Sequence, residues 1–327
     1  MLIPRYWSRA ESQATTPDGR PVRFHVWRGS RGSTAEAQAL ADEAVARIAE
    51  RIRQGAGFPE KYSYGDRPLR EEVVRELPGP AGAEPPDAAI TRNSYGALVL
   101  NAARAFFIDV DVEDAGPSRP QPQASPAAAP AQSLWGLVDS LPLPGGLRSI
   151  VDSFRPPSGS GPGAPTPPPP PASADPASAA VDRLRRFVAA RPGWRVRVYR
   201  TYAGLRYLVT HAPFAPTGAE VQSTMQALGT DPQYIRLCQV QKSFRARLTP
   251  KPWRIGVPNP PVRFPYEDLG EEQAMREWAA RYDSASAGRA TCTFLEELGE
   301  GAEHPDIAPL RALHDEQTRA TSGLPLA

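Results

Sequence analysis

A Pro-rich stretch in the middle of the chain is the strongest constraint on how the chain can fold. Residues 113–179 hold 17 of the 39 prolines, including the run Pro167–Pro171, among Ala, Ser and Gly. Such a composition buries too little apolar surface to offset the entropy lost on ordering, so we predict a disordered, partly polyproline II insertion over 113–178. An apolar island at 134–154 interrupts it. That island is either a linear docking motif for a protein partner or a chance cluster in a biased linker.

On either side of the insertion, the hydrophobic patterns predict an α+β core. Before it they indicate a hairpin over 6–28, a helix over 33–53, a shorter helix over 68–77, and extended segments over 89–92, 97–100 and 105–111. After it they indicate helices over 177–190, 218–228, 232–241, 271–283 and 305–321, and strands over 194–200, 205–210, 243–248 and 289–296. Strands in hairpins with helices between them favour a mainly antiparallel sheet covered by helices. We therefore expect one core made of residues 1–112 and 179–327, interrupted by the insertion.

Several classes of protein are disfavoured by simple counts. No apolar stretch approaches 18 residues and the first residues lack a leader pattern, so we expect a cytoplasmic protein with no membrane association. The two cysteines, Cys238 and Cys292, lack metal-ligand spacing, and the four histidines are scattered, which argues against a His/Cys metal site. There is no Gly-x-Ser-x-Gly motif to indicate a serine hydrolase.

Asp109 and Asp111 end a strongly apolar strand that begins Phe106-Phe107-Ile108. Because side chains alternate along a strand, both carboxylates face the same side. Two such carboxylates repel each other unless a cation neutralises them, so we consider them candidate catalytic and metal-ligating residues for Mg²⁺ or Mn²⁺. The plainer alternative is a strand that ends in solvated acids before a polar linker.

The positive charge of the chain is concentrated in one window. Residues 191–263 contain twelve Lys and Arg against two acidic residues, a net charge of +10, whereas the whole chain carries only +2. Codon usage can explain the scarcity of Lys but not this uneven distribution. A nucleotide or nucleic acid is the natural partner of such a surface. Aromatic residues that could stack on bases lie among the cations, namely Tyr199, Tyr202, Tyr207, Phe244 and Trp253. Alternatively, the cations pair with acids around 271–272 and 296–297.

The acidic strand, followed after an insertion by Thr201-Tyr202-Ala203-Gly204-Leu205-Arg206-Tyr207, resembles the archaeo-eukaryotic primase and primase-polymerase superfamily. In that family two aspartates bind a divalent metal, and a Thr/Ser-x-x-Gly-x-x-His turn contacts the phosphates of the incoming nucleotide. The resemblance implies a metal at Asp109 and Asp111, and phosphate contacts at Thr201, Gly204 and Arg206. Tyr207 stands where the family has His, and the later strand Phe244–Leu248 lacks the family's third carboxylate. A degenerate relative therefore fits as well as an active enzyme. Segments 90–96 and 244–256 are also similar to segments of bacterial proteins to which we assign no activity.

Two hypotheses follow from these patterns. The first is a nucleotide- or nucleic-acid-binding protein with a primase-like core, either a metal-dependent nucleotidyltransferase or a non-catalytic relative. Its expected phosphate-binding residues are Arg200, Thr201, Gly204, Arg206, His211, Lys242, Arg245, Arg247 and Lys251. The second is a non-catalytic interaction protein that uses a basic sheet face and the island at 134–154. The first hypothesis requires Asp109 and Asp111 to lie beside the 194–210 hairpin, with the basic side chains on the same face. The oligomeric state stays open.

Overall fold

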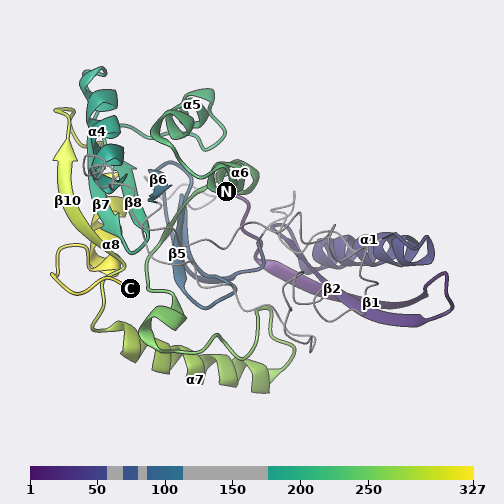
Figure 1. Ribbon diagram of the computed structural model, residues 1–327. Coiled ribbons are helices and arrows are strands. Elements are labelled where there is room, and N and C mark those ends of the chain that lie inside the picture. The colour runs from purple at the N-terminus through teal and green to yellow at the C-terminus, as the bar shows by residue number, and fades with distance from the viewer. Residues whose placement is uncertain (57–68, 80–86, 113–175) are drawn as a thin grey trace, which may run out of the picture. The chain divides into compact units, whose positions relative to one another are not determined.

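The computed structural model describes residues 1–56, 69–79, 87–112 and 176–327 (Figure 1). The strands are β1 (Tyr6–Thr15), β2 (Pro21–Ser30), β3 (Glu72–Leu77), β4 (Ala88–Arg92), β5 (Leu98–Ala102), β6 (Phe106–Asp111), β7 (Val196–Thr201), β8 (Gly204–Val209), β9 (Phe244–Arg247) and β10 (Cys292–Leu298). The helices are α1 (Thr34–Arg53), α4 (Pro176–Ala189), α5 (Ala219–Leu228), α6 (Pro232–Gln241), α7 (Leu269–Ser286), α8 (Ala308–Thr318) and the 3₁₀ turn η2 (Pro252–Ile255). Within these ranges, no helix has both the length and the apolar character needed to cross a membrane.

The α+β class is confirmed, but the strands of the described residues form three antiparallel sheets rather than one. Their strand orders are β1-β2, β10-β7-β8-β6 and β3-β4-β5-β9. The helix expected over 68–77 is wrong, because Glu72–Leu77 forms β3 and pairs with β4. The apolar spacing there is compatible with a helix, but the β-branched pair Val73-Val74 and an available partner edge on β4 favour the strand.

The segments before and after the Pro-rich stretch belong to one compact unit. β6 pairs with β8 across that stretch, so that Asp109 lies opposite Arg206 and Asp111 opposite Gly204. The predicted insertion at 113–178 and its island at 134–154 lie largely or wholly outside the described residues, and both stay predictions.

The N-terminal hairpin and α1 form as the sequence indicates. Ser33 caps α1, and its hydroxyl accepts a hydrogen bond from the Glu36 N–H at 3.1 Å. The helix then buries a small-residue stripe, including Ala41, Ala44 and Val45, against the hairpin. This packing gives the two-stranded sheet a small apolar core of its own.

The sheet that carries β6 is covered on both faces. Phe107 and Tyr199 lie on one face, where the His314 ring of α8 packs 5.1 and 4.8 Å from their ring centroids. The next position along the ladder, Tyr207, points to the other face, where Arg183 of α4 is close enough to affect its pKa. The side chains of Phe107, Tyr199 and Tyr207 are all fully buried, so this sheet forms the centre of the main hydrophobic core.

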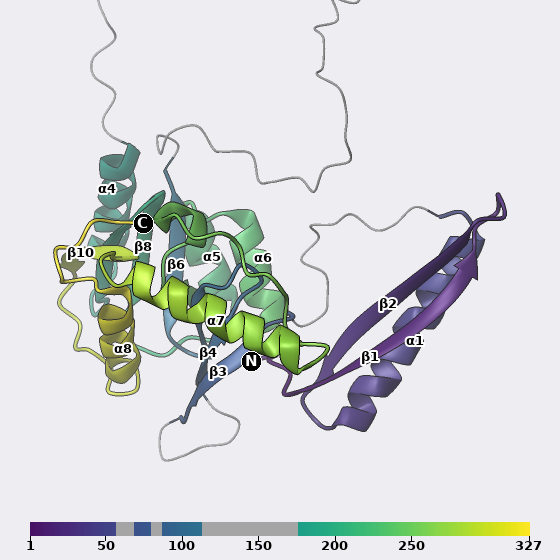
Figure 2. The same ribbon diagram turned by 90° about the horizontal axis from the view of Figure 1, so that it is seen from below.

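The free edge of β6 lies beside β9 of the third sheet. The rings of Phe106 and Phe244 pack there with centroids 4.9 Å apart. The Tyr234 hydroxyl of α6 bridges the two edges, since it lies 2.8 Å from the carbonyl oxygen of Arg245 and 3.3 Å from that of Phe107. Figure 2 shows α7 running in front of the sheets. The Trp278 ring of α7 lies next to Gly96 in the β4–β5 turn of the third sheet. The seam between β6 and β9 positions the candidate site.

A substitution at Gly204 tests the close approach between β8 and β6. A Cβ atom there would lie 2.1 Å from the carbonyl oxygen of Val110, and backbone cannot retreat as a flexible side chain can. We expect Gly204→Ala to lower the free energy of unfolding by about 1–3 kcal/mol or more, measured by urea denaturation. The matched control is Gly288→Ala, whose Cβ would meet nothing within 4 Å. Equal stability of the two variants would contradict this packing.

Candidate functional site

The candidate site lies where β6 ends beside the turn between β7 and β8. Asp109 and Asp111 point to the same face of the sheet, as their spacing predicts, and Arg206 points to that face from β8. Gly204 lies opposite Asp111, and the Val112 N–H donates to the carbonyl oxygen of Ala203 at 3.1 Å. The expected adjacency of the acidic strand and the 194–210 hairpin is therefore present in the structure.

Asp109 is held by a two-pronged ion pair with Arg206. The Arg206 Nε donates to Oδ1 of Asp109 at 2.7 Å, and Nη2 donates to Oδ2 at 3.0 Å. The Arg206 side chain is only 2% exposed, whereas that of Asp109 is 35% exposed. Burial by itself lowers the pKa of Arg206, but the adjacent Asp109 carboxylate outweighs it and raises that pKa above its ordinary value.

The remaining donor of Arg206 links the seam to α8. Its Nη1 donates to the carbonyl oxygen of Arg247 at 2.9 Å and lies 3.4 Å from the Nε2 of His314. Burial lowers the pKa of His314 to about 4, so the ring is neutral at pH 7. A neutral ring with its proton on Nδ1 satisfies both neighbours, because Nδ1 then donates to Asp315 Oδ1 at 3.3 Å while Nε2 accepts from Arg206.

Asp111, in contrast, is exposed at the end of β6. Partial desolvation, followed by the charges of Asp109 and Asp231, raises the pKa of Asp111, while Lys251 and Arg247 act in the opposite direction. Asp231 is the N-cap of α6, where its side chain accepts from the Gln233 N–H at 3.0 Å. The environment of Asp111 is therefore polar, and charges of both signs lie close to its carboxylate.

Arg247 and Lys251 lie near this carboxylate, and Arg254 lies near both of these cations. Arg247 ends β9, and Lys251 and Arg254 come from the η2 segment that follows. Burial, with the charges of Arg247 and Arg254, lowers the pKa of Lys251 to about 8, while Asp111 partly opposes this. The Nε of Arg247 and an Nη of Arg254 are buried without a hydrogen-bond partner in the part of the chain that the structure describes. Mutual repulsion thus remains among these cations.

Aromatic rings lie directly among these three cations. The Arg254 guanidinium stacks 3.9 Å from the centroid of the Tyr202 ring, and the Lys251 ammonium lies 5.4 Å from that of Trp253. Tyr95, from the β4–β5 turn, meets Trp253 edge-on at 5.4 Å. Tyr202 and Trp253 are 50% and 49% exposed, so each offers free ring surface. We call Tyr202, Arg247, Lys251, Trp253 and Arg254 the basic-aromatic surface.

Other residues expected at the site lie elsewhere. Arg200 is opposite Leu205, so it points to the other face of the sheet from Asp109. His211 follows the far end of β8, where its ring packs 4.8 Å from that of Trp194. Lys242 is exposed before β9, at the opposite end of that strand from Lys251.

Arg245 is committed to a buried network rather than to the surface. Its Nη2 donates to Glu71 at 2.7 and 3.0 Å, and its Nη1 donates to the Asn101 side chain. Thr91 completes the network by donating to Glu71 at 2.6 Å.

Thr201, at the end of β7, shares a face with Tyr199 and lies opposite Cys292 of β10. Of the aromatic residues expected to stack on bases, Tyr199, Tyr207 and Phe244 are fully buried in the core.

Ion pairs neutralise part of the excess positive charge of the 191–263 window. Arg195 and Arg197 both pair with Glu297, at 2.5 and 3.4 Å. These pairs agree with the alternative interpretation, in which the cations pair with acids around 296–297. Glu272, however, pairs with Arg276 of its own helix. The cations of the basic-aromatic surface keep their charge uncompensated by ion pairs within the described ranges, so the excess remains where the aromatic rings are.

Sequence reasoning missed two members of this region. Arg254 belongs to the basic window, and its place directly after Trp253 is the signal that indicates it. Tyr95 comes from a turn more than 150 residues away from Trp253, and no local pattern indicates that the two rings meet.

The donor set fits a divalent cation poorly. Both oxygens of Asp109 already accept from Arg206, which leaves Asp111 as the more available of the two carboxylates. Among the residues that the structure describes, no group of three or more His, Cys, Asp or Glu is arranged to hold a metal ion. The Mg²⁺ or Mn²⁺ site stays a prediction, and we derive no chemical step through it.

Comparisons with protein-family models, with curated proteins and with solved structures found no match for this chain.

Substitutions of the two aspartates separate their roles. Asp109→Asn removes the charge that compensates a buried guanidinium, so the variant should lose about 2–3 kcal/mol of unfolding free energy, somewhat less than for a fully buried pair because Asp109 is partly exposed. Asp111→Asn is the matched control. In the wild-type protein the pKa of Asp111 is raised in the folded state, so ionised Asp111 disfavours folding. The wild-type protein therefore loses unfolding free energy as the pH rises through that pKa.

Urea denaturation at pH 7 should therefore show Asp111→Asn to be at least as stable as the wild-type protein, with the difference shrinking toward pH 4 as Asp111 takes up a proton. Equal destabilisation by the two substitutions would contradict the separate roles of the two carboxylates.

Proposed function

We propose that this protein binds single-stranded nucleic acid or a nucleotide through the basic-aromatic surface. The observation that carries the proposal is the combination of uncompensated cations and half-exposed rings on one small surface. Cations that lack ion pairs attract phosphate groups, and each flat ring gives a base a face on which to stack. Neither feature by itself would indicate this ligand.

Nucleic acid suits this surface better than an acidic protein does. An acidic peptide would use the cations but leave the Trp253 and Tyr202 rings without matching partners. Base stacking on an aromatic ring contributes about 1–3 kcal/mol per base, whereas an exposed ion pair contributes about 1 kcal/mol or less. The rings therefore decide between the two partners, and Arg254 already shows the cation–ring stacking that such surfaces use.

A binding role is favoured over nucleotidyl transfer. In a primase-like enzyme Asp109 and Asp111 would share a metal, yet Arg206 neutralises Asp109 and ties it to β9 through the Arg247 carbonyl oxygen. A non-catalytic relative of that superfamily needs only the phosphate and base contacts. An assay for Mg²⁺- or Mn²⁺-dependent nucleotide incorporation by the wild-type protein tests the enzymatic alternative directly.

Salt dependence and ring removal test the binding proposal. Fluorescence anisotropy with a dT12 oligonucleotide should give affinities that fall steeply with NaCl concentration, because phosphate binding releases counterions. Trp253→Ala should weaken binding about 5- to 150-fold with the salt slope unchanged, since it removes stacking and no charge. Arg254→Gln should reduce the slope by about 0.7.

The control is Arg47→Gln, which removes an exposed, ion-paired arginine from α1 and should leave the affinity unchanged. Binding that ignores salt, or that Trp253→Ala leaves intact, would rule out the proposed surface.

The titration of Lys251 provides a separate test. Its pKa of about 8 means that its charge is lost as the pH rises from 7 to 9, so the affinity for dT12 should fall over this interval. Because a guanidinium does not lose its proton over this interval, the loss of positive charge from this surface belongs to Lys251. Lys251→Arg should flatten the pH profile between 7 and 9. An identical profile for the variant and the wild-type protein would show that Lys251 does not contact the ligand.

A further inference from the structure

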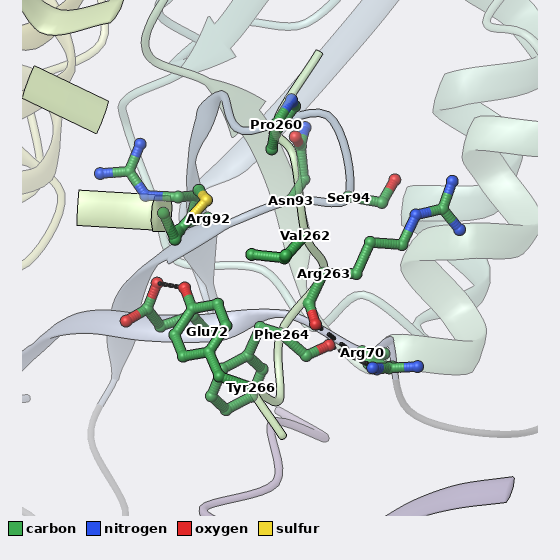
Figure 3. Close-up of a pocket in the computed structure, with 11 residues that line it drawn as sticks. Arg70, Glu72, Arg92, Asn93, Ser94, Pro260, Val262, Arg263, Phe264 and Tyr266 are labelled. Carbon is green, nitrogen blue, oxygen red and sulfur yellow. Dashed lines mark hydrogen bonds between the residues drawn. The ribbon is translucent and has the colours of Figure 1, made fainter. Parts of the chain in front are cut away.

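The β4–β5 turn, which contacts Trp253 through Tyr95, also lines a second positively charged site. It is a pocket of about 90 Å³ to which Arg70, Arg92 and Arg263 all contribute (Figure 3). Phe264 and Tyr266 form aromatic walls. The three guanidinium groups come from separate segments: the residues before β3, the end of β4, and the loop before α7.

Two arginines of this pocket, Arg70 and Arg92, donate to backbone carbonyl oxygens rather than to carboxylates. Arg70 donates to the carbonyl oxygens of Arg263 and Pro265, each at 3.3 Å, and to that of Phe264. Arg92 donates to the carbonyl oxygen of Gly96 at 2.9 Å. No ion pair joins these arginines to an acid within the described ranges. Burial and then the charge of Arg263 lower the pKa of Arg70, whereas the charges of Glu267 and Glu271 act in the opposite direction.

The carboxylate that lines the pocket is already occupied. Glu72 accepts a hydrogen bond from the Tyr266 hydroxyl at 2.9 Å, on the side of the pocket away from Arg263 (Figure 3). Three arginines and one glutamate give the lining a net charge of +2. In the same view Arg263 and Arg70 extend to one side, with Ser94 next to Arg263 as a neutral hydrogen-bond donor.

We propose that this pocket binds one phosphate group, held by Arg263 and Arg70 with Arg92 adding to the field. The charge of a phosphate monoester dianion balances the lining, and guanidinium forks match phosphate oxygens. The volume is well below the roughly 300–1,000 Å³ of pockets that enclose a whole drug-sized ligand, so a phosphate enters while the rest of the molecule stays outside.

The pocket and the basic-aromatic surface share two segments of the chain. The β4–β5 turn supplies Ser94 to the pocket and Tyr95 to the Trp253 ring. The stretch from Lys251 to Phe264 runs from one site to the other. A nucleic-acid strand bound at the basic-aromatic surface could therefore place one of its phosphates in the pocket. This source of the phosphate rests on the proposed function, whereas the anion site itself does not.

Calorimetric titration of the full chain with inorganic phosphate tests the anion site. The wild-type protein should bind phosphate, and Arg263→Gln should weaken the binding by tenfold or more, with Arg263→Lys in between. Arg263 is exposed, and within the described residues its side chain makes no hydrogen bond or ion pair, so the variant should fold. Arg276→Gln on neighbouring α7 is the matched control and should bind as the wild type does. Equal binding by Arg263→Gln and the wild type, or no binding by either, overturns the proposal.

Oligonucleotides identify the source of the phosphate. If it belongs to a strand, a 5′-phosphate on dT12 should tighten binding to the wild type and not to Arg263→Gln. If Arg263 affects inorganic phosphate only, the site serves a free phosphate or a small phosphate ester, and the anion site still stands. Trp253→Ala should abolish stacking without changing phosphate titration, so failure of the proposed function and failure of this pocket give different results.

Discussion

The guanidinium of Arg206 is buried at the seam between two four-stranded sheets, and the surroundings of that seam are arranged to compensate its charge. Its donors reach the Asp109 carboxylate on β6, the Arg247 carbonyl oxygen on β9 and the His314 ring on α8. A buried charge costs several kcal/mol unless paired in good geometry, so each partner is constrained to stay in place. The seam is therefore held by directional polar contacts as well as by the Phe106–Phe244 packing beside it.

Because of this ion pair, the two aspartates of β6 have different roles. Asp109 is committed to Arg206, whereas Asp111, two residues on, reaches water next to the basic-aromatic surface. The buried Arg206 guanidinium also orients β9, because the carbonyl oxygen of Arg247 at the end of this strand accepts a hydrogen bond from it. The η2 segment follows β9, so that Lys251 lies near Asp111, with Trp253 and Arg254 near Lys251. The location of the proposed ligand surface is thus a consequence of how one buried cation is satisfied.

Local elements were predictable where short-range chemistry decides them. The hairpin over 6–28, the helix over 33–53 and the same-face placement of Asp109 and Asp111 all appear as their residue types indicate. The prediction fails at β3, because its choice between helix and strand depends on the partner edge of β4. Gly204 marks a tight contact with the Val110 backbone, a role that a turn motif resembling a phosphate site does not reveal. Charge counts located a basic region correctly but could not assign its members, since Arg245 is paired with Glu71, 174 residues away in sequence.

The amino-acid sequence by itself determined the α+β character, the same-face placement of Asp109 and Asp111, and the concentration of cations after residue 191, because periodicity and composition are local properties of a chain. Only the tertiary structure decided which charges are free. Whether an arginine is neutralised depends on which carboxylate long-range strand pairing brings within about 3 Å of it, as for Arg206, or fails to bring, as for Arg247 and Arg263. Binding requires the free charges, so the candidate ligand sites follow from the fold and not from the charge pattern.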